Sequence, residues 1–279
     1  MRQKGPEMAE TDTRFVGPVP QIYDALMVPM LFEPYALDMA ARVAALVPDA
    51  VLETAAGSGV VARALAPLLR PGTRYVVTDL NAPMLDQARS RQTPAQGARI
   101  EWAVADALDL PYPDAAFDVL CCQFGVMFFP DRRKGFAEAR RVLKPGAPFL
   151  FSAWDSLAQN DVPATVWAVV QARYADNPPQ FFNKVPHGYH DADVIRADLT
   201  AAGFARINVE WVAKESRVAR ARDAAEALMM GTPFRMEMMA RDPDSLPGLV
   251  DATEAVLIRR YGAGPFVAPT RALVVTAQA

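Results

Sequence analysis

Between residues 50 and 154 the sequence alternates short apolar segments with helix-like segments, and this order constrains the fold more than any other feature. The apolar segments are residues 51–55, 74–80, 100–107, 116–124 and 147–154. Strands that alternate with helices form βαβ units, in which the strands run parallel and the crossovers are right-handed. The first two segments are almost continuously apolar, as strands are when helices cover both faces of a sheet. The sequence therefore predicts a doubly wound, mostly parallel α/β sheet.

The remainder of the chain predicts additions to this core. Residues 21–47 have helix-like spacing interrupted by Pro29 and Pro34, which predicts two or three short helices after a polar lead-in over 1–20. Later segments predict helices at 162–175 and 191–202, two helices within 221–262 separated by Asp242-Pro243-Asp244, and strands at 205–213 and 271–279, which bring the sheet to seven strands. We therefore divide the chain into an N-terminal helical segment (1–47), an α/β core (48–154), a helical insertion (155–203) and C-terminal strands (204–279) with a helical cap at about 219–265.

Composition excludes several classes of protein. The 279 residues are 52% hydrophobic and 22% charged, which is typical of a globular chain. The 29 Lys and Arg against 32 Asp and Glu give a net charge of −3 and no basic stripe, which argues against a nucleic-acid partner. The chain has no run of 18 apolar residues, so we expect no membrane span, and its first residues lack a signal peptide. We expect a cytoplasmic protein, either a monomer or a homodimer.

The junction after the first predicted strand carries the strongest functional signal. Gly57 and Gly59 in the stretch LETAAGSG allow a sharp turn and a close approach of the backbone to a ligand. Asp79 follows Gly59 by twenty residues at the end of the second strand, where its carboxylate can accept hydrogen bonds from both hydroxyls of a ribose. Nicotinamide cofactors, flavins and S-adenosylmethionine all use this pair of features.

Two further acidic positions separate these cofactors. Glu53 lies at the ligand-facing end of the first strand, where it would repel a pyrophosphate but suit a ligand that carries ammonium and sulfonium charges. Asp106 and Ala107 close the third predicted strand, where a carboxylate and a backbone N–H can read the edge of an adenine. These positions favour S-adenosylmethionine.

Residues 50–153 resemble the class I S-adenosylmethionine-dependent methyltransferases, in the methyltransferase-domain family that includes ubiquinone and menaquinone biosynthesis enzymes. Four stretches carry the resemblance in the family's order and spacing: LETAAGSG, VVTDLNAPML, VADALDLPYPDAAFDVL and EARRVLKPGAPFL. Ala56 departs from the family pattern, which has Gly or Cys there. The resemblance implies a seven-stranded Rossmann-like fold, a methyltransferase activity, S-adenosylmethionine as cofactor and no metal.

The resemblance also implies the positions that bind the cofactor. Those at its methionine end would be Glu53, Ala55, Gly57 and Gly59, with the backbone around Cys122 and Gln123 facing the ammonium group. Those at its nucleoside end would be Asp79 on the ribose hydroxyls, Asn81 and Met84 beside the adenine, and Asp106 and Ala107 on the adenine edge.

The methyl acceptor is less constrained, because displacement at a sulfonium needs alignment and exclusion of water more than it needs a catalytic dyad. A small, fairly apolar acceptor fits a cap of this composition. His187 and His190 are weak candidates for a base, although a loop histidine is more often structural. Phe124, Phe128 and Phe129 could form a wall of the acceptor pocket or could equally pack in the core. The methionines 229, 230, 236, 238 and 239 could contact the acceptor, although such a cluster is more often core. Tyr23 and Tyr35 could close over the cofactor.

Two alternative functions remain open at this point. Gly57, Gly59 and Asp79 also imitate the fingerprint of an NAD(P)-dependent oxidoreductase, although Glu53 and the lack of a YxxxK pair oppose it. A non-catalytic S-adenosylmethionine-binding or scaffold protein could share the fold. The adjacent Cys121 and Cys122 have no CxxC geometry, and we expect buried structural thiols rather than a redox site.

Overall fold

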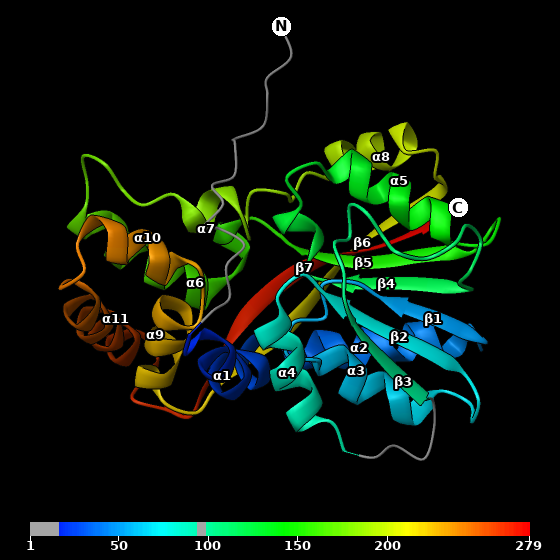
Figure 1. Cartoon of the computed structure of the whole chain (residues 1–279). Coiled ribbons are helices and arrows are strands. Elements are labelled where there is room, and N and C mark those ends of the chain that lie inside the picture. Colours follow the sequence, from blue (N-terminus) through cyan, green and yellow to red (C-terminus); the bar gives the residue numbers. More distant parts are fainter. Residues whose placement is uncertain (1–16, 94–98) are drawn as a thin grey trace, which may run out of the picture.

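The computed structural model describes residues 17–93 and 99–279, so the polar lead-in expected over residues 1–16 lies outside the described residues. A seven-stranded sheet forms the centre of the molecule (Figure 1). Its strands are β1 (Ala50–Glu53), β2 (Arg74–Asp79), β3 (Arg99–Val104), β4 (Val119–Gln123), β5 (Pro148–Trp154), β6 (Ala205–Val218) and β7 (Phe266–Gln278). Their order across the sheet is β3-β2-β1-β4-β5-β7-β6, and only β7 runs antiparallel to its neighbours. The predicted doubly wound, mostly parallel sheet is confirmed.

Helices cover both faces of the sheet, which explains the apolar runs of the central strands. One face packs against α2 (Glu33–Ala45) and α3 (Val60–Leu65), which bury a cluster that includes Met39, Leu65 and Val77. The other face packs against α5 (Arg132–Val142) and α8 (Ala192–Ala201) through Phe136 and Leu199. Helix α4 (Ala82–Arg91) contacts β2 and β3, and the 3₁₀ turns are η3 (Ala66–Leu68), η4 (Val126–Phe128) and η5 (Leu157–Gln159).

The N-terminal helical segment corrects one prediction. Instead of short helices broken at two prolines, α1 (Val19–Ile22), η2 (Tyr23–Phe32) and α2 follow one another without a gap, and Pro29 lies inside η2. The η2 segment is a π-helix, in which the N–H of Glu33 donates to the carbonyl of Val28, five residues earlier. This wider turn accommodates a residue without an N–H, and Pro34 stands in the first turn of α2, where a proline costs little.

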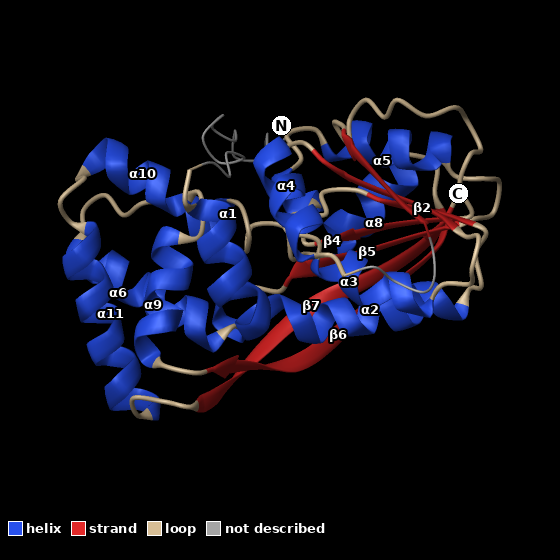
Figure 2. Cartoon of the chain, turned by 60° about the horizontal axis from the view of Figure 1, so that its bottom comes forward, coloured by secondary structure: helices blue, strands red, loops and turns tan. Residues whose placement is uncertain are grey.

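A cap of helices lies beyond the carboxyl ends of the strands (Figure 2). It contains α6 (Asp161–Arg173), α7 (Phe181–Lys184), α9 (Ala221–Met230), α10 (Phe234–Arg241) and α11 (Leu246–Tyr261). Residues 221–262 therefore form three helices rather than the two expected, because Gly231 and Pro233 end one helix and begin the next. Strand β7 pairs with β5 only from Ala272 onward, so residues 266–271 and their partners in β6 project past the sheet and carry α9, α10 and α11 toward its carboxyl edge.

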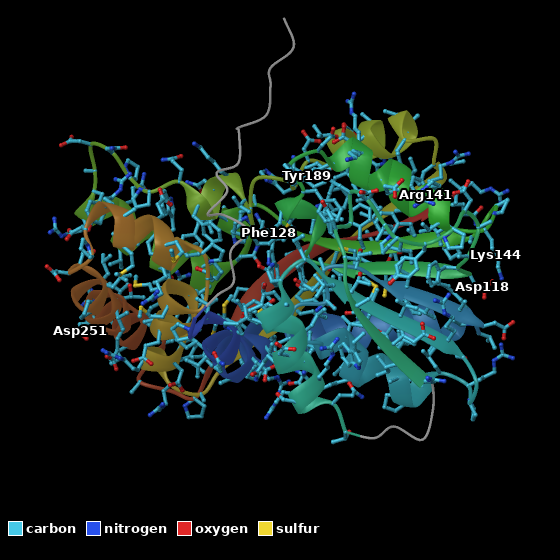
Figure 3. All side chains as sticks on the ribbon, viewed as in Figure 1. Asp118, Phe128, Arg141, Lys144, Tyr189 and Asp251 are labelled. Carbon is cyan, nitrogen blue, oxygen red and sulfur yellow. The ribbon has the colours of Figure 1, made fainter. Side chains whose placement is uncertain are left out.

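The sheet has a topological switch point between β1 and β4. The chain continues from β1 to β2 and β3 on one side, and from β4 to β5 on the other. At such a point the crossover helices diverge and leave a crevice outside the carboxyl ends of the strands, which is where open α/β sheets bind ligands. At the opposite edge of the sheet, Lys144 Nζ donates to Asp118 at 2.6 Å, far from Phe128 near the crevice (Figure 3).

No helix in the described part of the chain combines the length and apolarity needed to cross a membrane.

Candidate functional site

The crevice at the switch point is a cavity of about 1120 Å³ at the carboxyl ends of β1, β2, β3 and β4. Most of the residues that the sequence indicated for cofactor binding lie together on its wall. They are Glu53, Ala55, Gly57, Asp79, Asn81, Met84, Asp106, Ala107 and Gln123. Strand β3 ends at Val104, so Asp106 and Ala107 belong to the loop that follows it rather than to the strand itself.

The glycine-rich turn has the backbone that its sequence predicts. Ala55, Gly57 and Gly59 all have positive φ angles, of 52°, 58° and 79°. A Cβ atom on Gly57 would stand 3.5 Å from Met84 Cε, inside the cavity. Gly59 does not line the cavity: a Cβ there would be 2.8 Å from the Cβ of Ala88, so this glycine allows α3 to pack against α4. The structure therefore gives Gly59 a packing role, and its predicted place at the methionine end of a cofactor stays a prediction.

Asp79 connects the glycine-rich turn to α4. Its Oδ2 accepts the backbone N–H of Gly57 at 2.8 Å, and its Oδ1 accepts the backbone N–H of Asn81 at 2.8 Å. Burial raises the pKa of Asp79, while these hydrogen bonds oppose the rise. Asn81 occupies the N-cap position of α4, as predicted, and its side-chain amide donates to Asp79 at 3.3 Å. Oδ2 can accept one further hydrogen bond from a ligand, and Oδ1 can do so where the ligand replaces the long bond from the Asn81 amide.

Glu53 is the most deeply buried acid at the cavity, with 1% of its surface exposed. The hydroxyl of Tyr75, on the neighbouring strand β2, donates to its Oε2. Burial raises the pKa of Glu53 to about 8, and the negative charge of Asp79 adds to the rise, while the bond from Tyr75 opposes it. The sequence predicted the acid but not Tyr75, because this partner comes from another strand.

The charge on the cavity wall restricts the class of ligand. Of the described residues that line it, Glu53, Asp79 and Asp106 are acidic and none is basic. A pyrophosphate would meet carboxylates without a compensating cation, whereas a ligand with a positive charge and ribose hydroxyls would find acceptors. The wall therefore fits an adenosyl ligand with a cationic end better than a dinucleotide.

The adjacent cysteines on β4 point to opposite faces of the sheet. Cys121 packs in the cluster beneath α2 and α3, and Cys122 packs in the larger cluster on the other face. Both are free thiols, and burial raises the pKa of Cys122 to about 12. The side chain of Cys122 does not line the cavity, whereas Gln123 does and donates from Nε2 to the carbonyl of Phe32 at 3.3 Å. The prediction at these two positions concerned their backbone and stays a prediction.

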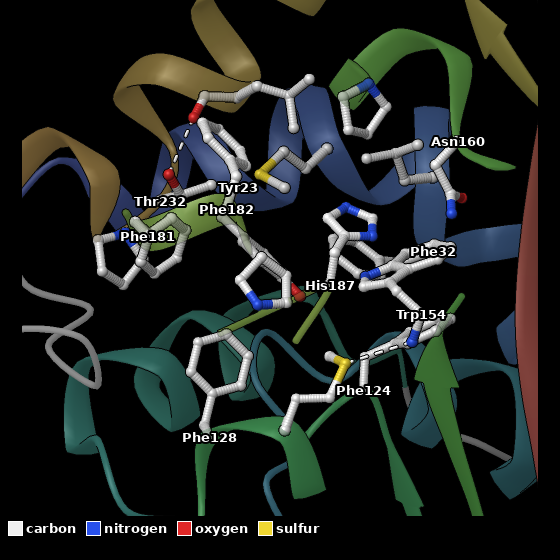
Figure 4. Close-up of a pocket in the computed structure, with 17 residues that line it drawn as sticks. Tyr23, Phe32, Phe124, Phe128, Trp154, Asn160, Phe181, Phe182, His187 and Thr232 are labelled. Carbon is white, nitrogen blue, oxygen red and sulfur yellow. Dashed lines mark hydrogen bonds between the residues drawn. The ribbon is translucent and has the colours of Figure 1, made fainter. Parts of the chain in front are cut away.

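A second cavity of about 600 Å³ lies beneath the cap and is lined mainly by aromatic and aliphatic side chains (Figure 4). It shares Tyr23, Phe32, Phe124 and Phe128 with the first cavity, so the two adjoin at an aromatic boundary. Phe124 stacks on Trp154 with 3.8 Å between ring centroids. Of the three phenylalanines that the sequence singled out, Phe124 and Phe128 line both cavities, and Phe129 lines the first alone.

The two histidines have different surroundings. His187 is 5% exposed and lines the second cavity, and its Nδ1 lies 2.8 Å from the carbonyl oxygen of Asp155. This contact requires a proton on Nδ1, so Nε2 is left as the acceptor. Burial lowers the pKa of His187 to about 4, which keeps the ring neutral at pH 7. His190 is exposed and lines neither cavity; its Nδ1 lies 2.7 Å from the carbonyl oxygen of His187.

Tyr35 and the five methionines that the sequence singled out lie away from the cavities. Tyr35 is buried and donates to the carbonyl of Val212 at 3.1 Å, so of the two tyrosines only Tyr23 reaches the cavity walls. None of the methionines at 229, 230, 236, 238 and 239 lines either cavity, and Met229 and Met238 are core residues. The methionines that do line them are Met27, Met84 and Met127.

Sequence reasoning missed most of the cap wall. Trp154, Asn160, Phe181, Phe182, Leu228 and Thr232 come from four separate segments that the fold brings together. Each lies in an apolar or helical context that looks like ordinary core in the sequence. Only Trp154, at the carboxyl end of a predicted strand, carried a signal that could have identified it.

Comparisons with known proteins agree with this geometry. A family model described as a methyltransferase domain matches residues 52–151. The chain is 31% identical to a demethylmenaquinone methyltransferase of Clavibacter sepedonicus over 177 residues, which are 59% of this chain and 69% of that protein. It is 38% identical to a ubiquinone/menaquinone biosynthesis C-methyltransferase of Bordetella avium over 117 residues, which cover 42% of this chain and 45% of that protein. The chain thus spans about half the length of several curated relatives that it matches.

Solved structures share the fold at low sequence identity. The YcgJ protein of Bacillus subtilis matches with a TM-score of 0.56 and 18% identity over 88% of this chain and 98% of that one. The [4+2]-cyclase SpnF matches with a TM-score of 0.54 and 20% identity over 88% of this chain and 80% of that one. At this level of identity the likeness shows the fold alone, and a cyclase among the matches illustrates that one fold carries more than one reaction.

Proposed function

The chain belongs to the class I S-adenosylmethionine-dependent methyltransferases, the family that includes the quinone-biosynthesis methyltransferases, and from this premise we propose that it transfers a methyl group to a small, fairly apolar acceptor. The observation that carries the proposal is the pair of adjoining cavities. One is lined by acids and a glycine-rich turn, the other by aromatic side chains, and they share Tyr23, Phe32, Phe124 and Phe128. A cofactor and an acceptor could meet at that boundary.

The first cavity would hold S-adenosylmethionine. Asp79 would accept the ribose hydroxyls, one at the remaining lone pair of Oδ2 and one at Oδ1 in place of the long bond from the Asn81 amide, and Asn81 and Met84 would flank the adenine. Asp106 and the backbone of Ala107 would read the adenine edge. Glu53, Ala55, Gly57 and the backbone at Gln123 would surround the methionine end. Several positive φ angles in the turn support this arrangement, because they let the backbone approach a ligand closely.

When bound, the cofactor supplies a methyl group activated by a positively charged sulfur. The contribution of the protein is to align the acceptor with that methyl group and to exclude water. Phe124, stacked on Trp154, and Phe128 form an apolar boundary at the place where the two ligands would meet. A rigid aromatic boundary of this kind favours one approach direction.

We propose that His187 orients the acceptor. Its Nδ1–H is engaged by the carbonyl of Asp155, so the acceptor atom Nε2 is the ring nitrogen available to a ligand in the second cavity. A neutral imidazole can accept a hydrogen bond from a hydroxyl or amine, and can take its proton when the nucleophile requires it. His190 is exposed and outside both cavities, so we assign it no role in the reaction.

The two alternative functions have less support. A nicotinamide dinucleotide would place its pyrophosphate in a cavity whose described lining contains three acids and no base. A purely scaffolding protein would need no cavity of about 600 Å³ on the far side of the aromatic boundary.

Calorimetric titration with S-adenosylmethionine, S-adenosylhomocysteine and NADH tests the proposal. We expect micromolar binding of both adenosyl ligands, weakened at least tenfold in Asp79→Ala, because that variant loses the ribose acceptor and the bond to Gly57. The control Asp49→Ala removes an exposed carboxylate at the amino end of β1 and should bind as the wild type does. Binding of NADH in place of the adenosyl ligands, or of none of the three, would contradict the proposal.

The acceptor cavity has its own test. Leu228 is buried on α9 and lines only the second cavity, so Leu228→Trp should fill acceptor space. With any acceptor that supports turnover, we expect kcat/KM to fall at least a hundredfold while affinity for S-adenosylhomocysteine stays within twofold. The control Ile258→Trp adds the same ring to a half-exposed position on α11 and should change neither quantity. Equal activity in Leu228→Trp would place the acceptor elsewhere.

A further inference from the structure

A buried hydrogen bond joins Glu53, at the end of β1, to Tyr75 on β2, a residue to which the function proposed so far assigns no part. The side chains of Glu53 and Tyr75 lie on the same face of the sheet, because Val51 pairs with Tyr75 and Glu53 lies two residues further along β1. Both are essentially inaccessible to solvent, with 1% and 0% of their surfaces exposed. Glu53 nevertheless lines the cofactor cavity, so a ligand can reach it although bulk water cannot solvate it fully.

The groups that face Glu53 do not supply a positive partner. Asp79, at the end of β2, adds a like charge, and Tyr75 and Cys121 are neutral neighbours from β2 and β4. The charge of Arg63 on α3 opposes the rise in the pKa of Glu53, but its guanidinium already donates to the carbonyl of Ser58 at 2.6 Å and to Asp24 at 3.0 Å. Across residues 17–93 and 99–279, no salt bridge to Glu53 is formed.

Burial without a cation favours the protonated carboxyl group. Burial raises the pKa of Glu53 to about 8, which favours the protonated carboxyl group at pH 7. Tyr75 keeps its own proton, because burial and the neighbouring Glu53 raise its pKa well above the usual range. The free protein therefore holds one exchangeable proton at the wall of the cofactor cavity.

We propose that cofactor binding is coupled to the release of this proton: the ammonium group at the methionine end replaces the proton of Glu53 as the positive partner, and Tyr75 positions the resulting carboxylate. The inference rests on the proposed function. A cation within about 4–6 Å favours the ionised form of a carboxyl group, typically by one to three pKa units. The proton passes to solvent, no covalent bond of the ligand changes, and the buried carboxylate gains an ion pair and keeps the bond from Tyr75.

Proton release can be counted directly. Titration of the wild type at pH 7.0 in phosphate and in Tris should give binding enthalpies that differ by roughly half to one times the difference between the ionisation enthalpies of the two buffers. That difference corresponds to the release of about half to one proton per bound ligand. We expect this with both S-adenosylmethionine and S-adenosylhomocysteine, because both carry the ammonium group. Equal enthalpies in the two buffers would overturn the inference while leaving the proposed function intact, and release with S-adenosylmethionine alone would overturn the assignment to the ammonium group. Failure of either ligand to bind would contradict the proposed function itself.

Two variants separate coupling from a merely structural role. Glu53→Gln keeps a neutral side chain of the same shape, so it should bind more weakly and release no proton, and its dissociation constant should not change between pH 6 and pH 7. In the wild type the constant should fall by about two- to eightfold over the same interval, for a pKa of Glu53 lowered by one to three units on binding. Tyr75→Phe should still release the proton but bind several-fold more weakly at pH 7, because the carboxylate has lost its donor.

The matched control is Tyr261→Phe, which removes a similar hydroxyl-to-carboxylate bond, to Asp161, far from the cofactor cavity. It should change neither the affinity nor the proton count. Unaltered affinity in Tyr75→Phe would remove Tyr75 from the inference, and a proton count that persists in Glu53→Gln would assign the release to another group.

Discussion

At the scale of single residues, burial holds two titratable side chains in their neutral forms at the cavity walls. Glu53 keeps its proton because it has no cation, and His187 stays unprotonated because an imidazolium would be unsolvated beneath the cap. Groups with displaced pKa values of this kind cluster at functional sites. Holding Glu53 protonated costs folding free energy at pH 7, because the carboxyl group of the unfolded chain is ionised there.

His187 predicts a pH dependence of stability. As pH falls, the unfolded histidine takes up a proton near pH 6.5, whereas the folded ring does so only near pH 4. The unfolded state binds more protons in that window, so the wild type loses stability as the pH decreases. In His187→Gln this part of the loss is absent, and between pH 7.5 and pH 5 the difference from wild type should amount to about 2 kcal/mol. Urea unfolding of both proteins at both pH values measures it; parallel pH dependences would show that His187 is not held neutral.

The acids and glycines around the first cavity were predictable because local spacing determines where they stand. Asp79, at a strand end, and Gly57, in a tight turn, are placed by the βαβ unit itself. The packing of Gly59 against Ala88 was not predictable, because a glycine that admits a ligand and one that admits a neighbouring helix look alike in sequence. The Cys122 side chain packs into the core while Gln123, one residue later, lines the cavity, so only the backbone of Cys122 stays a predicted ligand contact.

At the scale of elements, the buried carboxylate of Asp24 connects η2 to the elements around the cofactor cavity. Asp24, on η2, accepts the hydroxyl of Ser58 at 2.8 Å and Nη2 of Arg63 at 3.0 Å, and it forms an ion pair with Nε of Arg91 at 3.0 Å. One side chain thus joins η2 to the glycine-rich turn, α3 and α4. Tyr23, its neighbour in sequence, forms part of both cavity walls.

Removing this charge should loosen the helix. Asp24→Asn leaves two arginines without their shared carboxylate, and we expect the free energy of unfolding to fall by about 2 kcal/mol. Asp86→Asn is the matched control: it breaks an exposed pair with Arg89 on α4 and should change stability by less than about 0.5 kcal/mol. Chemical denaturation of the three proteins gives the comparison, and equal losses in the two variants would show that Asp24 does not anchor η2.

The sequence could not predict this arrangement of elements. Pro29 suggested a helix break, and only a neighbouring structure that stabilises a π-helical turn allows the proline inside a continuous helix. The partners of Asp24 lie 34 to 67 residues further along the chain. Pairs at that separation are fixed by the packing of α3 and α4 against the sheet, which no local pattern specifies.

At the scale of the whole molecule, the long antiparallel strands β6 and β7 carry cap helices across the carboxyl edge of a parallel sheet. The sheet and its ligand edge followed from the alternation of strands and helices. The existence of a cap also followed from the irregular segments after Trp154. The inner surface of the cap could not be predicted in this way. Met27 on η2, Phe182 on α7 and Leu228 on α9 line one cavity although about 200 residues separate the first from the last.

A crystal structure of the protein with S-adenosylhomocysteine tests the central claim most directly, because it locates both ends of the ligand at once. We expect the ribose hydroxyls on Asp79, the ammonium group beside Glu53, and the sulfur directed toward the boundary formed by Tyr23, Phe32, Phe124 and Phe128. The aromatic cavity beneath the cap would then lie on the side from which an acceptor approaches. A ligand bound with its sulfur directed away from that boundary, or bound within the aromatic cavity itself, would contradict the account.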